Sequence, residues 1–173
     1  MGAHRPIQRH ASTRMTNIRI AQQSEQEALH RIDQFYLYEF SRFMPEYYKL
    51  DQDGVFQDGD YLEYWSDPKK YPYLILEDDE LAGFALVRED GSHFNLDQFF
   101  VLLKFQGQGT AYNAATQVFD AHRGTWELHS LKNNTKSEGF WPRVVATYTS
   151  GAYNKTSLAP KHTHHVYTFR NEP

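Results

Sequence analysis

Alternation of apolar and polar residues predicts where the strands of this chain lie. In Asn17–Gln22 the apolar residues Ile18 and Ile20 are two positions apart, as in a strand with one buried face. Tyr71–Glu77 and Leu81–Arg88 are two longer strand-like runs on either side of three acidic residues. That arrangement predicts a β-hairpin.

Further runs extend the sheet. His93–Leu102 is expected to be the third strand of an antiparallel meander, and Thr125–Leu131 a later strand. Gly83, inside the second hairpin strand, predicts a bulge or a close backbone approach. The expected terminal strands fall at or near Tyr148, Tyr153 and Val166–Phe169.

Three segments have helical rather than strand periodicity. The first opens at a capping box, Ser24–Glu27, and runs to about Phe43, before Pro45. The other two predicted helices are Gly107–His122 and Asn134–Val145. The expected inner face of the first helix consists of Ala28, Leu29, Ile32, Phe35, Tyr36 and Phe40.

This order of elements predicts an α/β fold of the mixed-sheet (α+β) kind. A mostly antiparallel central sheet would have helices on both faces, giving three layers. Residues 15–173 are expected to form one domain. Residues 1–14 are basic and lack apolar periodicity, so we expect a vector-derived leader or a disordered tail, with a targeting peptide as the alternative.

Charge and composition exclude several classes of protein. Residues 1–14 hold three arginines, so the remainder has 15 basic against 22 acidic residues. This acidic balance argues against nucleic-acid binding and is compatible with a positively charged amine as substrate. No apolar run reaches the roughly 18 to 20 residues that cross a bilayer. The chain has no cysteine, which excludes disulfides and a cysteine nucleophile and fits a cytoplasmic location.

The nine histidines do not predict a metal site. His162, His164 and His165 lie close together in the sequence, but His164 and His165 would face opposite sides of a strand. No carboxylate lies near His162 and His164 to complete a ligand set. A structural or surface role is expected instead.

One segment carries a chemical prediction of its own. Val101–Ala111 has the pattern of a strand that ends in a glycine-bearing turn and continues into a helix. Unpaired amides at such a helix start, with the positive end of the helix dipole behind them, bind phosphate. Gly107 and Gly109 would let phosphate approach the backbone. The alternative is an ordinary strand-to-helix turn.

Two motifs then resemble those of one family. Gln106-x-x-Gly109-x-Ala111 resembles the acyl-CoA pyrophosphate loop of the GNAT acetyltransferases, usually Arg/Gln-x-x-Gly-x-Gly/Ala. Downstream, Asn134-x-x-Ser137-x-x-Phe140-Trp141 resembles the family's Asn-x-x-Ala-x-x-Phe/Leu-Tyr/Trp pattern. The resemblance covers about residues 71–148 and is greatest to bacterial N-acetyltransferases.

The resemblance implies a set of cofactor-binding residues. The strand that contains Phe99, Phe100 and Val101 would pair its backbone with the pantetheine amides. It would run parallel to Thr125–Leu131 and splay away from it. Asn134 would contact the cofactor arm, with a helix N-cap as the alternative. The implied set is Phe99, Phe100, Val101, Gln106, Gly107, Gln108, Gly109, Thr110, Ala111, Asn134, Phe140 and Trp141.

Catalytic roles are implied for three residues. Asp97 and Glu127 lie on the two splayed strands and are candidate general bases, with a solvated or structural carboxylate as the alternative for each. Trp141 stands where many relatives have a tyrosine acid, and indole cannot protonate a thiolate. Tyr148 is the candidate substitute.

The resemblance therefore implies an acetyl-CoA-dependent N-acetyltransferase that uses no metal. The acetyl group would pass directly to an amine of a small molecule or peptide in a ternary complex, and a homodimer is compatible with this. The alternative is a non-catalytic acyl-CoA-binding or regulatory module. The first helix and residues 44–66 would form the acceptor wall for a cationic or aromatic-contacting acceptor, unless these residues are a solvated acidic loop. The residues concerned are Tyr47, Tyr48, Asp51, Asp53, Phe56, Asp58, Asp60, Tyr61 and Trp65.

Overall fold

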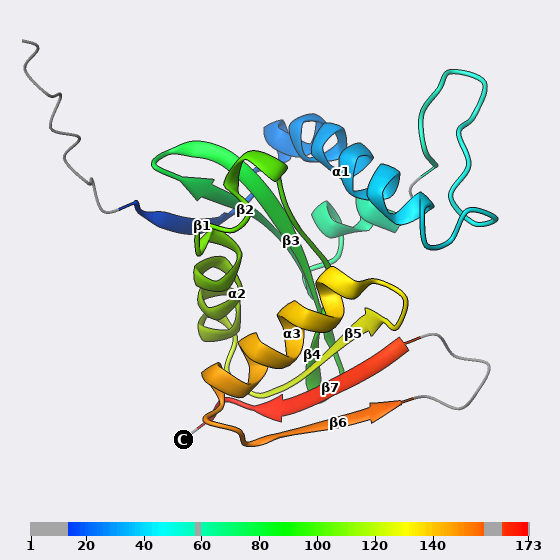
Figure 1. Cartoon of the computed structure of the whole chain (residues 1–173). Helices are drawn as coiled ribbons and strands as arrows, with labels where there is room; N and C mark the ends of the chain where they lie inside the picture. Colours follow the sequence, from blue (N-terminus) through cyan, green and yellow to red (C-terminus); the bar gives the residue numbers. More distant parts are fainter. Residues whose placement is uncertain (1–13, 58–59, 158–163, 173) are drawn as a thin grey trace, which may run out of the picture.

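A single mixed sheet organises the protein. The computed structural model describes residues 14–57, 60–157 and 164–172. Within them, seven strands are arranged in the order β1-β2-β3-β4-β5-β7-β6, and only β4 and β5 are parallel neighbours (Figure 1). The strands are β1 Thr16–Ile20, β2 Lys70–Glu77, β3 Glu80–Asp90, β4 His93–Val101, β5 Thr125–Leu131, β6 Tyr153–Ser157 and β7 His164–Arg170.

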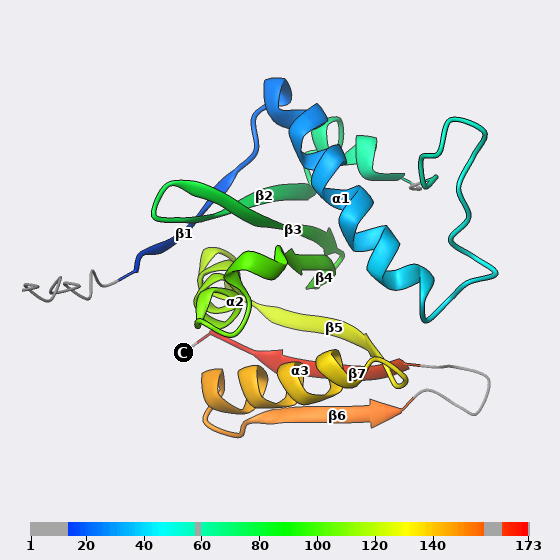
Figure 2. The ribbon, with the colours of Figure 1, turned by 45° about the horizontal axis from the view of Figure 1, so that its top comes forward.

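Helices cover both faces of the sheet, as expected. The helix α1, Gln26–Ser41, lies on one face, and α2, Thr110–Ala121, and α3, Thr135–Tyr148, lie on the other (Figures 1 and 2). Short 3₁₀ segments are Gln23–Glu25, Asp60–Trp65 and Leu103–Phe105. The predicted three-layer mixed fold is confirmed.

The strands β2 and β3 are buried on both faces. Alternate residues of β2 and β3 point to opposite sides, so Leu74 and Phe84 pack under α1 while Ile75 and Ala85 pack under α2 and α3. This two-sided burial explains the near-continuous apolar runs in these strands. Gly83 lies where a Cβ would be 2.1 Å from the carbonyl oxygen of Phe100, which confirms the predicted close approach.

The second half, β5-β7-β6, is covered on one face. Trp126 and Leu128 of β5 are buried beneath α2 and α3. Glu127 and His129 alternate with them and so point to the opposite face, which is the α1 side of the sheet. There the described residues place no helix over these three strands (Figure 2).

The start of α1 differs from its prediction. The Gln22 amide donates to the Glu25 carboxylate at 2.9 Å, so the capping box is Gln22–Glu25 and not the predicted Ser24–Glu27. The helix is entered through the 3₁₀ turn Gln23–Glu25. Phe35, predicted to be buried, is 58% exposed, and Leu37 is buried instead. The inner face is thus set by the residues that reach β3 and β4, which helical spacing alone locates to within one position.

The end of α3 also differs from its prediction. The helix continues one turn past Val145 to Tyr148, so Tyr148 is not in a terminal strand as expected. The ring of Tyr148 packs against Phe119 of α2 and Phe169 of β7, which holds the extra turn in place. Within the described residues, no helix combines the length and apolar character needed to cross a membrane. The segment 1–13, and the predictions made for it, lie outside these residues.

Candidate functional site

The two parallel strands separate partway along their length. Four residue pairs join them, from His93↔Thr125 to Leu96↔Leu128. Past Leu96, Asp97 is an extra residue in β4 relative to β3, where Val87 pairs with Leu96 and Leu86 with Gln98. Such a bulge bends its strand. Residues 97–101 of β4 and 129–131 of β5 therefore border a gap that we call the fork, and the diverging strands are visible in Figure 1.

Both sides of the fork have an unpaired strand edge. Beyond the last pair, β4 continues to pair with β3, and β5 continues to pair with β7. The backbone groups that face the gap have no strand opposite them, and such edges bind extended chains. The predicted splay of a parallel pair is thus confirmed.

The turn before α2 has the form of an anion site. Gly107 and Gly109 have φ angles of 73° and 92°, which favour glycine. A Cβ at Gly107 would meet no atom within 4 Å, so the outer side of this turn is open. The Asn113 amide donates to the Gly109 carbonyl at 3.0 Å, whereas in the described part of the chain the amides of residues 107–112 reach no backbone carbonyl. These amides and the helix dipole are available to a phosphate.

Two glutamines stabilise the turn. The side-chain amide of Gln106 donates to the carbonyl of Val101 at 2.7 Å, and that of Gln108 donates to the carbonyl of Lys104 at 2.8 Å. The turn is therefore tied to the end of β4, and the side chain of Gln106 is engaged within the protein. Thr110, the first residue of α2, is 1% exposed, and Ala111 follows it half-buried.

The aromatic residues of β4 lie on opposite sides of the sheet. Phe100 packs under α1 with its ring 6.1 Å from that of Tyr36. Phe99 faces α3, with ring centroids 6.2 Å from Phe140 and 5.3 Å from Trp141. Phe100 and Val101 thus belong to the buried core, and the half-buried Phe99 packs against it. The backbone role of these three residues toward a ligand stays a prediction.

Asn134 caps α3. Its side-chain oxygen accepts from the amide of Ser137 at 3.2 Å, and the residue is 8% exposed. The N-cap alternative is therefore observed. A contact with a cofactor stays a prediction, as it does for Phe140 and Trp141.

Asp97 stands where the fork begins and is held by two partners. The Tyr64 hydroxyl donates to it at 2.6 Å, and the Arg88 guanidinium donates at 3.0 and 3.2 Å. Burial, followed by the charge of Asp97, raises the pKa of Tyr64, so this phenol remains protonated. The bond to Asp97 raises the pKa of Arg88. The carboxylate is thus positioned on the α1 side of the sheet with both oxygens engaged.

Glu127 has a partner that the sequence prediction missed. The Nε2 atom of His129 lies 2.8 Å from its carboxylate, and both residues are on the α1 side of β5. His129 is the first residue of β5 beyond the pairing with β4, just as Asp97 is on the other strand. The signal in the sequence was the Glu-x-His spacing, which puts two side chains on one face of a strand.

Tyr148 is at the wrong place for the proposed acid. Its hydroxyl donates to Asp120 at 2.8 Å and accepts from Asn171 at 3.2 Å. These partners lie near the start of β5, and Tyr148 ends α3, whereas Asn134 and the fork lie at the other ends of α3 and β5. The geometry therefore does not favour Tyr148 as the acid, because it lies at the end of α3 that is remote from the fork.

Residues 44–66 were expected to form an acceptor wall of aromatic and acidic side chains, and only some of these side chains are free to do so. Asp51 accepts from the amides of Asp53 and Val55 at 2.9 and 3.0 Å, and the bond to Val55 is the main reason that its pKa is lowered. It is thus a turn residue. Tyr48 packs against Phe40 of α1, whereas Tyr47 is 74% exposed. Asp58 lies outside the described residues.

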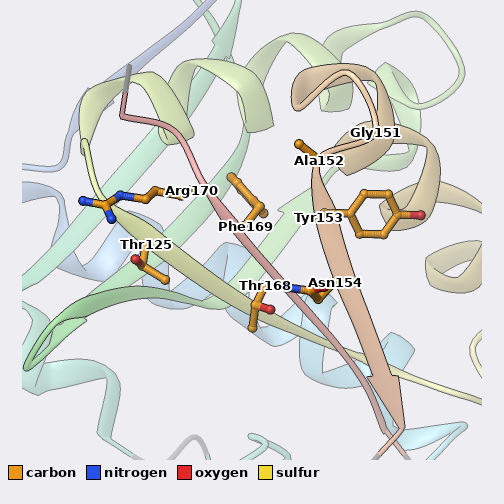
Figure 3. Close-up of a pocket in the computed structure, with 8 residues that line it drawn as sticks. All are labelled: Thr125, Gly151, Ala152, Tyr153, Asn154, Thr168, Phe169 and Arg170. Carbon is orange, nitrogen blue, oxygen red and sulfur yellow. The ribbon is translucent and has the colours of Figure 1, made fainter.

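A surface depression lies at the other end of β5. It has a volume of ≈ 490 Å³ and contains Thr125, the first residue of β5, together with Asn154, Thr168 and Arg170 (Figure 3). The fork begins only after Leu128, so the two features are separate. In residues 14–57, 60–157 and 164–172, no three acidic or histidine side chains gather as metal ligands do.

Comparisons with known proteins match this geometry. The model of the acetyltransferase (GNAT) family matches residues 32–145. An acetyltransferase from Thermus thermophilus is 15% identical, with a TM-score of 0.61 over 90% of this chain and 97% of that one. A protein described as a putative streptothricin acetyltransferase from Bacillus anthracis, solved with acetyl coenzyme A, is 12% identical, with a TM-score of 0.58 over 91% and 99%.

A third solved structure has a stated acceptor. The ribosomal-protein-S18-alanine N-acetyltransferase from Escherichia coli is 12% identical, with a TM-score of 0.53 over 89% of this chain and 91% of that one. At these identities the solved structures support the fold alone. No curated protein matches the chain. The family model spans well over half of the sequence, and the chain therefore belongs to the acetyltransferase (GNAT) family.

Proposed function

We propose that this protein transfers the acetyl group of acetyl-CoA directly to an amine. The fork is the observation that carries the proposal, because it offers two unpaired strand edges to an extended amide-bearing arm. The open turn at Gln106–Ala111 adjoins the end of β4 and would bind the pyrophosphate through its amides. The arm would then run between the strands, with its acetyl end toward Asp97 and His129.

Direct transfer requires no covalent intermediate on the protein. The acceptor nitrogen attacks the thioester carbon, the C–N bond forms as the C–S bond breaks, and CoA leaves as a thiolate that takes a proton. The sequence contains no cysteine that could carry the acetyl group as a thioester. We therefore propose that acetyl-CoA and the acceptor bind together in a ternary complex. We also propose a cytoplasmic location, which the lack of cysteine fits.

The acceptor would approach from the α1 side. Asp97, Glu127 and His129 all lie on this side, beside the β5-β7-β6 strands that no described helix covers there. The carbonyl of Phe43, just past α1, accepts from Asn133, just before α3, at 3.4 Å. Residues 44–57 therefore begin near the wide end of the fork. Their tyrosines and aspartates favour a cationic acceptor.

A non-catalytic acyl-CoA-binding module is the second candidate. One observation favours it: α3 provides no phenol at the fork, because Trp141 is buried against Phe99 and Tyr148 lies at the far end of the helix. A module would bind acetyl-CoA and leave the thioester intact.

Thiol release separates the two candidates. The purified protein is incubated with acetyl-CoA and amines of several classes, including polyamines, aminoglycosides, amino acid amides and peptides with free N-termini. Free CoA thiol and the mass of the acetylated amine are measured together. We expect both products with at least one cationic amine. Acetyl-CoA binding by calorimetry without thiol release for any class would favour the module.

A further inference from the structure

The apex of the fork has a histidine on one side and a carboxylate on the other. Asp97 and His129 are the first residues beyond the last β4–β5 pair, one on each strand. The Asp97 carboxylate is engaged by Arg88 and Tyr64. His129, with a side chain that is 43% exposed, is engaged by Glu127 through one ring nitrogen.

That single bond defines what the imidazole can do. A carboxylate accepts hydrogen bonds, so in the neutral ring Nε2 carries the hydrogen that is donated to Glu127 at 2.8 Å. The lone pair is then on Nδ1. A carboxylate in this position also fixes the orientation of the ring. The pair therefore has the parts of an oriented general base.

The charged and titratable groups around the ring fit this role. His164 of β7 has its ring centroid 6.2 Å from that of His129, on the same face. Across the apex stands Asp97, whose charge is balanced by Arg88. The carboxylate bonded to the imidazole is that of Glu127, which is 32% exposed and lies on the same strand. The base is thus reachable from the side on which an acceptor would enter.

We propose that His129 is the general base of the acetyl transfer and that Glu127 is its positioning residue. This rests on the proposed function, since it places the acetyl group at the apex. Nδ1 of His129 takes one proton from the acceptor ammonium, and the freed amine attacks the thioester carbon. The C–N bond forms, the C–S bond breaks, and the second nitrogen proton passes to the leaving thiolate. The sequence prediction had assigned the base to Glu127 itself or to Asp97.

An affinity label tests the proposal without a known acceptor. Bromoacetyl-CoA places an alkylating carbon where the acetyl group lies, and the imidazole nitrogen displaces bromide to give a carboxymethyl derivative of histidine after hydrolysis. Peptide mass spectrometry locates the adduct, and chromatography of the hydrolysed protein distinguishes Nδ1 from Nε2 substitution. Affinity for acetyl-CoA is measured separately by calorimetry.

We expect rapid labelling of His129 at Nδ1, blocked by acetyl-CoA. In His129→Gln the labelling rate should fall by about 100-fold or more, because the reagent loses its oriented nucleophile. In Glu127→Gln, His129 should still be labelled, but as a mixture of Nδ1 and Nε2 adducts, since glutamine can accept or donate. A merely structural Glu127 would leave the Nδ1 preference unchanged.

Two histidines serve as controls. His165 is the neighbour of His164 in β7 but faces α3, where it contacts Glu138 at 3.0 Å, so it should stay unlabelled. His164→Gln should leave the labelling of His129 intact. Labelling at His164 or Asp97 in place of His129, or equal rates in wild type and His129→Gln, would overturn the proposal while acetyl-CoA binding stands. Failure to bind acetyl-CoA would overturn the proposed function as well.

Discussion

The two halves of the sheet differ in how many of their faces are covered by helices. Strands β2 and β3, at the centre of the first half, lie between α1 on one side and α2 with α3 on the other, and their central residues are buried whichever way they point. Strands β5, β7 and β6 are covered on one face, and the other face carries Glu127, His129 and Thr168. The difference shows that packing fills both sides of the first half, whereas the second half leaves polar side chains accessible to a ligand.

The fork lies at the boundary between these halves. β4 belongs to the doubly covered half, and β5 to the half covered on one face, and their pairing ends after four residues. The bulge at Asp97 turns β4 away from β5 while β4 keeps its pairing with β3. A gap with unpaired edges can therefore exist next to a well-packed core.

The largest expected effect is in the core of the second half. Trp126 is fully buried and packs on Phe119 and Phe169. Trp126→Ala should lower the free energy of unfolding by about 3–5 kcal/mol, because it removes a large ring and leaves a cavity. Urea denaturation followed by circular dichroism measures the change. A loss below about 1 kcal/mol would mean that the covered face of β5 is not the core described.

Gly109→Glu should weaken acetyl-CoA binding more than it destabilises the fold. Gly109 precedes α2 with φ 92°, and a carboxylate there would meet the pyrophosphate. We expect acetyl-CoA affinity to fall by about 100-fold or more, which is about 2.7 kcal/mol. Calorimetry measures it. The matched control is Gly91→Glu, at a φ of 59° in the β3–β4 turn and at the other end of β4. Equal affinity in both variants would remove the turn from the site.

Gly83→Ala tests the doubly covered half. The new Cβ would lie 2.1 Å from the Phe100 carbonyl oxygen, so β3 and β4 must move apart. We expect a loss of about 1–3 kcal/mol in unfolding free energy. At Gly91 no atom lies within 4 Å of the position of a Cβ. Gly91→Ala should therefore lower the unfolding free energy by only roughly 1 kcal/mol, which is the cost of alanine at a positive φ. Equal losses would refute the close approach.

Glu25→Gln tests the attachment of α1 to β1. The bond from Arg19 is the main reason that the pKa of Glu25 is lowered, to about 2. A carboxylate whose pKa is lowered by folding stabilises the fold when the pH is above its pKa in the unfolded chain. This contribution is lost as the pH falls toward its pKa in the folded protein. Since the pair is partly exposed, the variant should be about 0.5–1 kcal/mol less stable at pH 7. Denaturation curves of the two proteins should converge between pH 4.5 and 2. A constant difference would contradict this account.

The smallest effect is expected on the open face. Thr168 pairs with Glu127 of β5 and Asn154 of β6, and it lines the depression in Figure 3. Thr168→Ala should change the unfolding free energy by less than about 0.5 kcal/mol. It should also leave acetyl-CoA affinity unchanged. Loss of acetyl-CoA binding would instead indicate that the cofactor binds in the depression and not in the fork.

In both halves the sequence predicted the strands better than the faces and ends of the helices. Thr125–Leu131 has the predicted bounds, and the hairpin strands are extended by only a few residues, because alternation and turn residues are local signals. The α1 face was misjudged at Phe35 because helical spacing does not say which edge of the apolar stripe meets the sheet. Tyr148 was misplaced because packing against Phe119, a long-range contact, lengthens α3.

The candidate site shows the same limit. The turn at Gln106–Ala111 has a local signature, and its glycines have the left-handed φ angles that the motif requires. The bulge at Asp97 and the bond between Glu127 and His129 depend on strand register, which a sequence pattern does not fix. The residues nearest the expected chemistry were therefore the hardest to assign.

A crystal structure of the complex with acetyl-CoA would show whether the cofactor binds in the fork. We expect pyrophosphate oxygens within hydrogen-bond distance of the amides of Gln108–Ala111. We also expect the pantetheine arm between β4 and β5, with the acetyl carbon between Asp97 and His129. Acetyl-CoA bound in the depression at Thr125, Asn154 and Thr168, with the fork closed by its own side chains, would contradict binding in the fork.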